Sequence, residues 1–154
     1  MTTKSEKLLA VYARLSHAIA GIPDARAEDL HRLAAGVPQF VAEARLREPK
    51  PTCAEIAAGL EQGLTEFPQL TADVDSQWRP AVSRALHEAL SAEYPELLDL
   101  ERHHVAGILA RGRIGTEAEF HAVRHRVDVL EGEPELGEEL KALYALVSAH
   151  ATGA

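Results

Sequence analysis

Apolar residues recur along this chain every three or four positions, and prolines and glycines separate one such series from the next. This interval places the apolar side chains on one face of a helix, which can bury them against other helices. Alternating runs rich in β-branched residues, which strands need, do not occur in the sequence. The pattern therefore predicts an all-α protein, a compact bundle of seven or eight short helices without a sheet.

Prolines and glycines set several of the predicted helix boundaries. Gly36 is expected to end the second helix, and Pro38 fits the first position of a short third helix. Residues 68–75 are expected to be irregular. Further on, Pro95 is expected to open a helix that Gly112 ends.

Two helix starts carry the sequence pattern of a capping box. Thr52 with Glu55 matches the pattern T-x-x-E, in which each side chain accepts a hydrogen bond from the backbone N–H of the other residue. Thr116 with Glu119 repeats the pattern. Both threonines are therefore expected to precede a helix.

The helix that follows Thr52 carries two glycines four residues apart, Gly59 and Gly63. Glycine costs a helix roughly 1 kcal/mol relative to alanine, so this spacing favours the close approach of another backbone, from this chain or from a second subunit. The alternative is two tolerated glycines on a surface helix. Cys53 belongs to the apolar stripe of the same helix and is expected to be a buried, unreactive thiol.

Length, charge and cysteine content narrow the class of protein. The 154 residues, 46% of them apolar, fit one helical domain over residues 1–154. A net charge of −8 argues against nucleic-acid binding, and no run approaches the roughly 20 apolar residues of a membrane span. The single cysteine fits a reducing compartment, so a cytoplasmic location is expected.

The predicted helix over residues 117–131 carries a candidate metal site. His121, His125 and Asp128 share a face that differs from the apolar face of this helix. Because residues three and four apart are neighbours on a helix, two imidazoles and a carboxylate could reach one transition metal ion such as zinc or iron. A solvated polar face has the same sequence pattern, and this alternative stays open.

The preceding helix places two polar side chains, Glu101 and His104, within its apolar sector. A buried carboxylate is costly unless it is paired, so Glu101 is expected to have a partner if it lies inside. A hydrogen bond between the two residues at the edge of the core is one interpretation. A pocket for a small ligand between the helices, marked by this pair, is another.

The turn over residues 112–117 is a candidate anion or partner contact. Unpaired N–H groups at the start of the next helix, with Arg111, Arg113 and Arg124 nearby, are suited to holding an anion. In the simpler interpretation the arginines pair with the acidic stretch over residues 131–139.

No catalytic sequence motif occurs: a phosphate-binding glycine loop, a nucleophile elbow and H-E-x-x-H are all missing. The leading hypothesis is therefore a non-enzymatic helical module without a cofactor, which interacts with a protein partner or with itself as a homodimer. Segregation of a basic section, residues 111–126, from the acidic section that follows supports this hypothesis. Metal binding and small-ligand binding are the alternatives.

Overall fold

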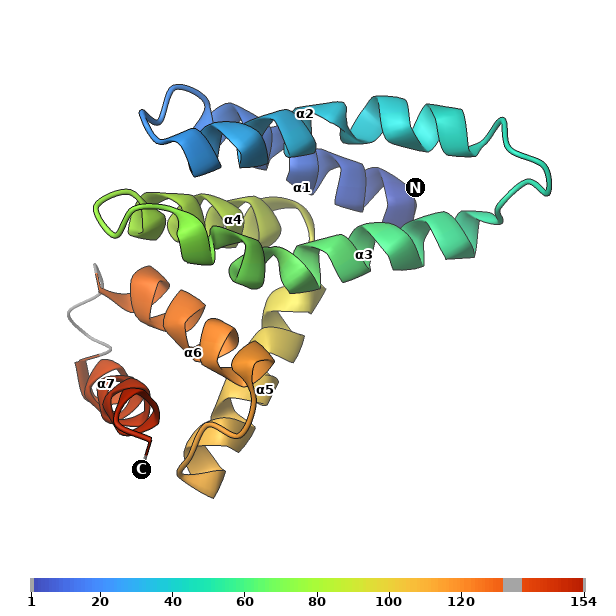
Figure 1. Ribbon diagram of the computed structural model, residues 1–154. Coiled ribbons are helices and arrows are strands. Elements are labelled where there is room, and N and C mark those ends of the chain that lie inside the picture. The colour runs from blue at the N-terminus through green and yellow to red at the C-terminus, as the bar shows by residue number, and fades with distance from the viewer. Residues whose placement is uncertain (1, 132–136, 154) are drawn as a thin grey trace.

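The computed structural model describes residues 2–131 and 137–153. Within these ranges the chain forms seven α-helices, one short 3-10 helix and no strand, which confirms the all-α prediction (Figure 1). The helices are α1 (Lys4–Ile19), α2 (Ala25–Ala44), α3 (Cys53–Leu70), η1 (Thr71–Asp73), α4 (Arg79–Glu93), α5 (Pro95–Arg111), α6 (Glu117–Leu130) and α7 (Gly137–Ala151). None of the described helices is long and apolar enough to cross a membrane.

The helices bury two hydrophobic clusters. Helix α1 is the centre of the first, where it packs against α2, α3 and α4. The second cluster is smaller and is formed by the C-terminal half of α5 together with α6 and α7. Helix α6 joins the two, because it packs against α3 and α4 as well as against α5 and α7 (Figure 1).

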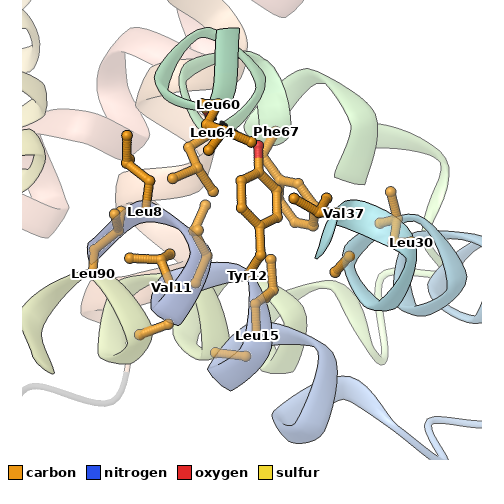
Figure 2. Close-up of a cluster of buried hydrophobic side chains, with 14 of the residues drawn as sticks. Leu8, Val11, Tyr12, Leu15, Leu30, Val37, Leu60, Leu64, Phe67 and Leu90 are labelled. Carbon is orange, nitrogen blue, oxygen red and sulfur yellow. Dashed lines mark hydrogen bonds between the residues drawn. The ribbon is translucent and has the colours of Figure 1, made fainter. Parts of the chain in front are cut away.

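Tyr12 occupies the middle of the first cluster (Figure 2). Its ring lies among leucines of α1 and α3 and beside Phe67, which is fully buried. The hydroxyl group donates a hydrogen bond to the backbone carbonyl of Leu60, with an O···O distance of 2.9 Å. Burial raises the pKa of Tyr12 to about 12, so this hydroxyl stays protonated and keeps its hydrogen bond.

The same hydroxyl explains one of the two glycines of α3. A Cβ atom on Gly63 would lie 2.5 Å from the Tyr12 hydroxyl oxygen, whereas a Cβ atom on Gly59 would meet nothing within 4 Å. The expected close approach therefore occurs at Gly63 alone, and the neighbour is a tyrosine side chain of the same chain rather than another backbone.

Helix α2 runs through both residues that were expected to interrupt it, so the boundary prediction at Gly36 and Pro38 was wrong. The apolar face of α2 continues across them, with Ala34, Val37 and Val41 all buried. A proline inside a helix removes one hydrogen bond and costs about 3 kcal/mol. Burial of a continuous apolar face offsets that cost, as tertiary packing often overrides local preference.

Helix α3 also corrects the sequence interpretation at both ends. Cys53 is exposed rather than buried, because it lies in the first turn beside the projecting α2–α3 connection (Figure 1). At the other end, the helix continues through Pro68 to Leu70, and η1 follows, so residues 68–75 are largely helical. The capping box of Thr52 and Glu55 is confirmed by both of its hydrogen bonds.

We expect alanine to have opposite effects at the two glycines of α3. Gly59→Ala should stabilise the fold by up to about 1 kcal/mol, since the site is open and alanine favours a helix. Gly63→Ala should destabilise it by about 1–3 kcal/mol, since the new methyl group displaces the buried Tyr12 hydroxyl. Urea unfolding followed by circular dichroism measures both changes.

The double variant Tyr12→Phe/Gly63→Ala identifies the cause. With phenylalanine at position 12, Gly63→Ala should lower the free energy of unfolding by less than it does in the native chain, because the atom nearest the new methyl group is absent. An equal cost in both backgrounds would contradict the steric explanation.

Candidate functional site

Helix α6 is buried on more than its apolar face. Val123, Val127 and Leu130 join the second hydrophobic cluster, as the helical spacing predicts. His125 and Asp128 are also buried, with 7% and 1% of their surfaces exposed. Since α3 and α4 cover this side of α6, the solvated polar face allowed by the sequence is not found for these two residues.

Asp128 is bound by polar groups of α4. Its Oδ2 atom lies 3.1 Å from Nε of Arg79 and accepts a hydrogen bond of 3.0 Å from the Ser83 hydroxyl. The guanidinium of Arg84 also donates to the Asp128 backbone carbonyl, over 3.4 Å. A buried carboxylate requires such partners, because an isolated buried charge is strongly destabilising.

The expected metal ligands are therefore not grouped around one point. Asp128 faces Arg79 and Ser83, whereas His121 and His125 line a pocket with α3 and α5. In the part of the chain that the structure describes, no three His, Cys, Asp or Glu side chains are grouped so that they could hold a metal ion. The geometry thus gives no support to the alternative of a zinc or iron site.

A cavity of about 340 Å³ lies between the two hydrophobic clusters. Helices α3, α4, α5 and α6 all contribute side chains to it. Its apolar walls include Leu98, Val105, Pro68, Ala122 and Val129. Its charged and titratable groups are Glu66, His87, Glu101, Arg102, His104, His121, His125 and Arg126.

His125 is the most enclosed of the polar side chains that line the cavity. Neither ring nitrogen has a hydrogen-bond partner among the described residues, and both are out of contact with solvent. Burial, reinforced by His87 and Arg126, lowers the pKa of His125 to about 4, so the ring is neutral at neutral pH. Nδ1 of His121 is likewise buried and unpaired within the described ranges.

Glu101 lines the same cavity and is half-buried. Burial raises the pKa of its carboxyl group to about 7, while the positive charge of Arg126 acts in the opposite direction. Arg126 itself is held by Glu139 of α7, at 3.1 Å and 3.3 Å. His104 also lines the cavity, but its side chain is exposed and no hydrogen bond joins it to Glu101.

Two arginines of the candidate anion contact, Arg111 and Arg124, have local partners. The side chain of Arg113 is exposed and forms no hydrogen bond or ion pair with the described residues. Arg111 is bound to Glu119 and to the backbone carbonyl of Arg113, and this contact, with the Gly115 N–H, lowers the pKa of Glu119 to about 2. Of the expected capping box only one hydrogen bond forms, from the Glu119 N–H to the Thr116 hydroxyl. The Glu119 carboxylate instead accepts a hydrogen bond from the Gly115 N–H.

Two other arginines, Arg124 and Arg126, lie on the helix that follows this turn. The guanidinium of Arg124 lies 5.7 Å from the centre of the Phe120 ring, close enough for a cation–π contact. The expected pairing of Arg111 and Arg113 with the acidic stretch is not found among the described residues: Arg111 binds Glu119, and it is Arg126 that binds Glu139. Residues 132–136 of that stretch lie outside the described residues.

Sequence reasoning did not include His87 in the site. His87 belongs to α4 and lies one helical turn after Ser83, which is fully buried beside Asp128. A buried serine and a histidine at this spacing are a weak sign of a polar seam on an otherwise apolar face. Burial lowers the pKa of His87, with Arg126 and Arg102 adding to the effect.

A scan against protein-family models finds no match, and searches of curated proteins and of solved structures find no similar protein. The chemistry of the site therefore rests on its own geometry. A carboxyl group with a pKa of about 7 beside neutral imidazoles can bind polar groups of a small molecule and exchange a proton with it at neutral pH.

We expect Glu101→Gln to change how stability depends on pH. The ordinary pKa of this carboxyl is 4.5 and the folded value is about 7. Between these values the folded state keeps a proton that the unfolded state has released, so the stability from this group is full below pH 4.5 and is lost as pH rises towards 7. Relative to the native chain, the free energy of unfolding of the glutamine variant should therefore rise by about 3 kcal/mol as the pH increases from about 4 to about 8.

Urea unfolding at several pH values, followed by the fluorescence of the single tryptophan, Trp78, measures this difference. Glu96→Gln removes a carboxyl group from an exposed position of the same helix and corrects for the change in net charge. Parallel stability curves for Glu101→Gln and the native chain would show that Glu101 is not buried in the folded state.

Proposed function

We propose that this protein binds a small organic molecule in the cavity between α3, α4, α5 and α6. The observation that carries the proposal is the buried imidazole of His125, which has no described partner at either ring nitrogen. An unsatisfied buried polar group costs about 1–3 kcal/mol. A ligand with a hydrogen-bonding atom would supply the missing partner once the ring turns a covered nitrogen towards the cavity that it lines.

The shape and lining of the cavity support the same proposal. Its volume of about 340 Å³ falls at the lower end of the range for pockets that bind small molecules. Apolar side chains such as Leu98 and Val105 form part of the wall, and eight charged or titratable groups converge on it. An apolar wall with convergent polar groups is a feature of ligand sites.

Replacement of His125 by leucine tests whether the imidazole is kept for ligand binding. We expect His125→Leu to stabilise the chain by about 1–2 kcal/mol, since an apolar side chain of similar size replaces an unpaired polar one. The change is measured by urea unfolding. His17→Leu, at an exposed histidine of α1, is the matched control and should alter stability by less than about 0.5 kcal/mol.

Fragment screening of the native chain tests binding itself. Ligands of the cavity should shift the imidazole resonances of His87, His121 and His125 in NMR spectra, and His125→Leu should weaken their binding. Two results would count against the proposal: a destabilised His125→Leu, which would mean that the imidazole is structural, or a folded native chain whose cavity histidines no fragment perturbs.

A second candidate function is binding to a protein partner or to a second copy of this chain. Leu33 and Phe40 are 47% and 56% exposed, and at seven residues apart they share one face of α2. Leu46, in the connection to α3, is 83% exposed. Exposed apolar side chains close together are a feature of interaction surfaces.

A reducing, cytoplasmic setting fits the exposed thiol of Cys53.

Light scattering over a range of concentrations tests the homodimer. If α2 forms the interface, the native chain should dimerise as concentration rises, and Phe40→Ser should shift this equilibrium towards the monomer because it removes an exposed apolar anchor. Arg32→Ser, at an exposed polar position of the same helix, is the control. A monomer at every concentration would remove the homodimer.

A further inference from the structure

The ligand cavity contains one partly buried carboxyl group, Glu101, that the fold leaves without a counter-charge in contact. We infer that its ligand is an organic cation, a protonated amine or amidine on an apolar body, whose charge pairs with Glu101; this inference rests on the proposed ligand site.

The neighbouring carboxylates are either exposed or already paired. Glu66, which also lines the cavity, is exposed to solvent and accepts a hydrogen bond from Gln62. Asp128 is bound by Arg79, and Glu139 is bound by Arg126. Glu101 forms no hydrogen bond or ion pair with any residue that the structure describes, although it lines the cavity and is half-buried. A carboxylate in such a place lacks both full hydration and a partner, so a cationic ligand would satisfy it.

Neither of the two arginines that line the cavity supplies that partner. Arg126 lines the cavity, but two of its guanidinium nitrogens bond the carboxylate of Glu139. The other lining cation, Arg102, is exposed and lies 3.9 Å from Asp99 of its own helix. Arg126 could hold an anionic ligand only in competition with Glu139, and an anion in the cavity would also lie near Glu101, so it would be bound less well.

The imidazoles suit the same ligand class. A neutral imidazole has one nitrogen that accepts a hydrogen bond. His125, whose nitrogens are unpaired, and His121, whose Nδ1 is unpaired, would accept N–H bonds from a protonated amine or amidine once a ring turns its covered nitrogen towards the cavity. The apolar residues Leu98, Val105 and Val129 would contact the uncharged body of the ligand. A net charge of −8 attracts cations at longer range.

Binding of a cation should strengthen as pH rises. The charged and titratable groups around Glu101 are Glu66 of α3, His87 of α4, Arg102 and His104 of α5, and His121, His125 and Arg126 of α6, with Glu139 of α7 behind Arg126. At low pH the carboxyl group of Glu101 is neutral, because burial raises its pKa to about 7, so it offers a cation no opposite charge. At higher pH Glu101 ionises and can pair with the cation.

Three aromatic probes of similar size and different charge test the inference: benzylamine, benzyl alcohol and benzoate. Titrations at about pH 5.5 and about pH 8 follow the imidazole resonances of the cavity histidines. At the higher pH, benzylamine should bind the native chain roughly tenfold or more tighter than the alcohol or benzoate. Its affinity should fall at the lower pH, where benzylamine itself remains protonated.

Variants at two glutamates assign the effect. Glu101→Gln should remove the preference for benzylamine and its pH dependence, whereas Glu96→Gln, at an exposed position of the same helix, should keep both. Circular dichroism confirms that each variant is folded. If Glu101→Gln fails to fold, Glu101→Met, which replaces the carboxyl group by an apolar group of similar length, serves the same comparison.

The outcomes separate this inference from the proposed function. Equal affinity for all three probes, or a preference for benzylamine that survives in Glu101→Gln, would overturn the cation assignment and leave the ligand site in place. Binding of other fragments without any binding of benzylamine would also overturn the cation assignment and leave the ligand site in place. If no fragment or probe perturbs the cavity histidines of the folded chain, the ligand site itself is wrong and the inference falls with it.

Discussion

The packing of α6 between two hydrophobic clusters is the constraint on which the rest of the structure depends. A helix with apolar residues on one face normally leaves its polar face in water. Here α5 and α7 cover the apolar face, and α3 and α4 cover part of the polar one. The chain must therefore bury polar side chains of α6, and burial without partners is costly.

The fold meets this constraint in two different ways within one helical turn. Asp128 is satisfied by Arg79 and Ser83, so it serves as a structural connection between α4 and α6. His125, three residues earlier, receives no comparable partner from the described residues, and the cavity lies beside it. A structural role is therefore clear for Asp128, while His125 and Glu101 are the residues for which a bound molecule offers the explanation. Natural proteins break local rules most often where they bind or react.

Helical spacing was enough to predict an all-α protein, because period and capping depend on local sequence. Burial overrode local signals at Gly36 and Pro38 in α2, and the absence of a covering helix left Cys53 exposed. Glu101 was placed on the inward side, where it is half-buried, but His104, which was expected beside it, is exposed. The position of Glu101 relative to His87 on another helix depends on how the helices pack, which periodicity does not encode. For the same reason the metal interpretation joined Asp128 to the histidines when its partners lie on α4.

The most direct measurement is an NMR titration of the His125 ring nitrogens in the ligand-free chain. Burial without a partner predicts that the ring stays neutral as pH falls from neutrality and takes up a proton only near pH 4, where its pKa lies. Protonation close to the ordinary value of 6.5 would contradict the account, since it would mean that water or another group already solvates this imidazole and that no ligand is needed to satisfy it.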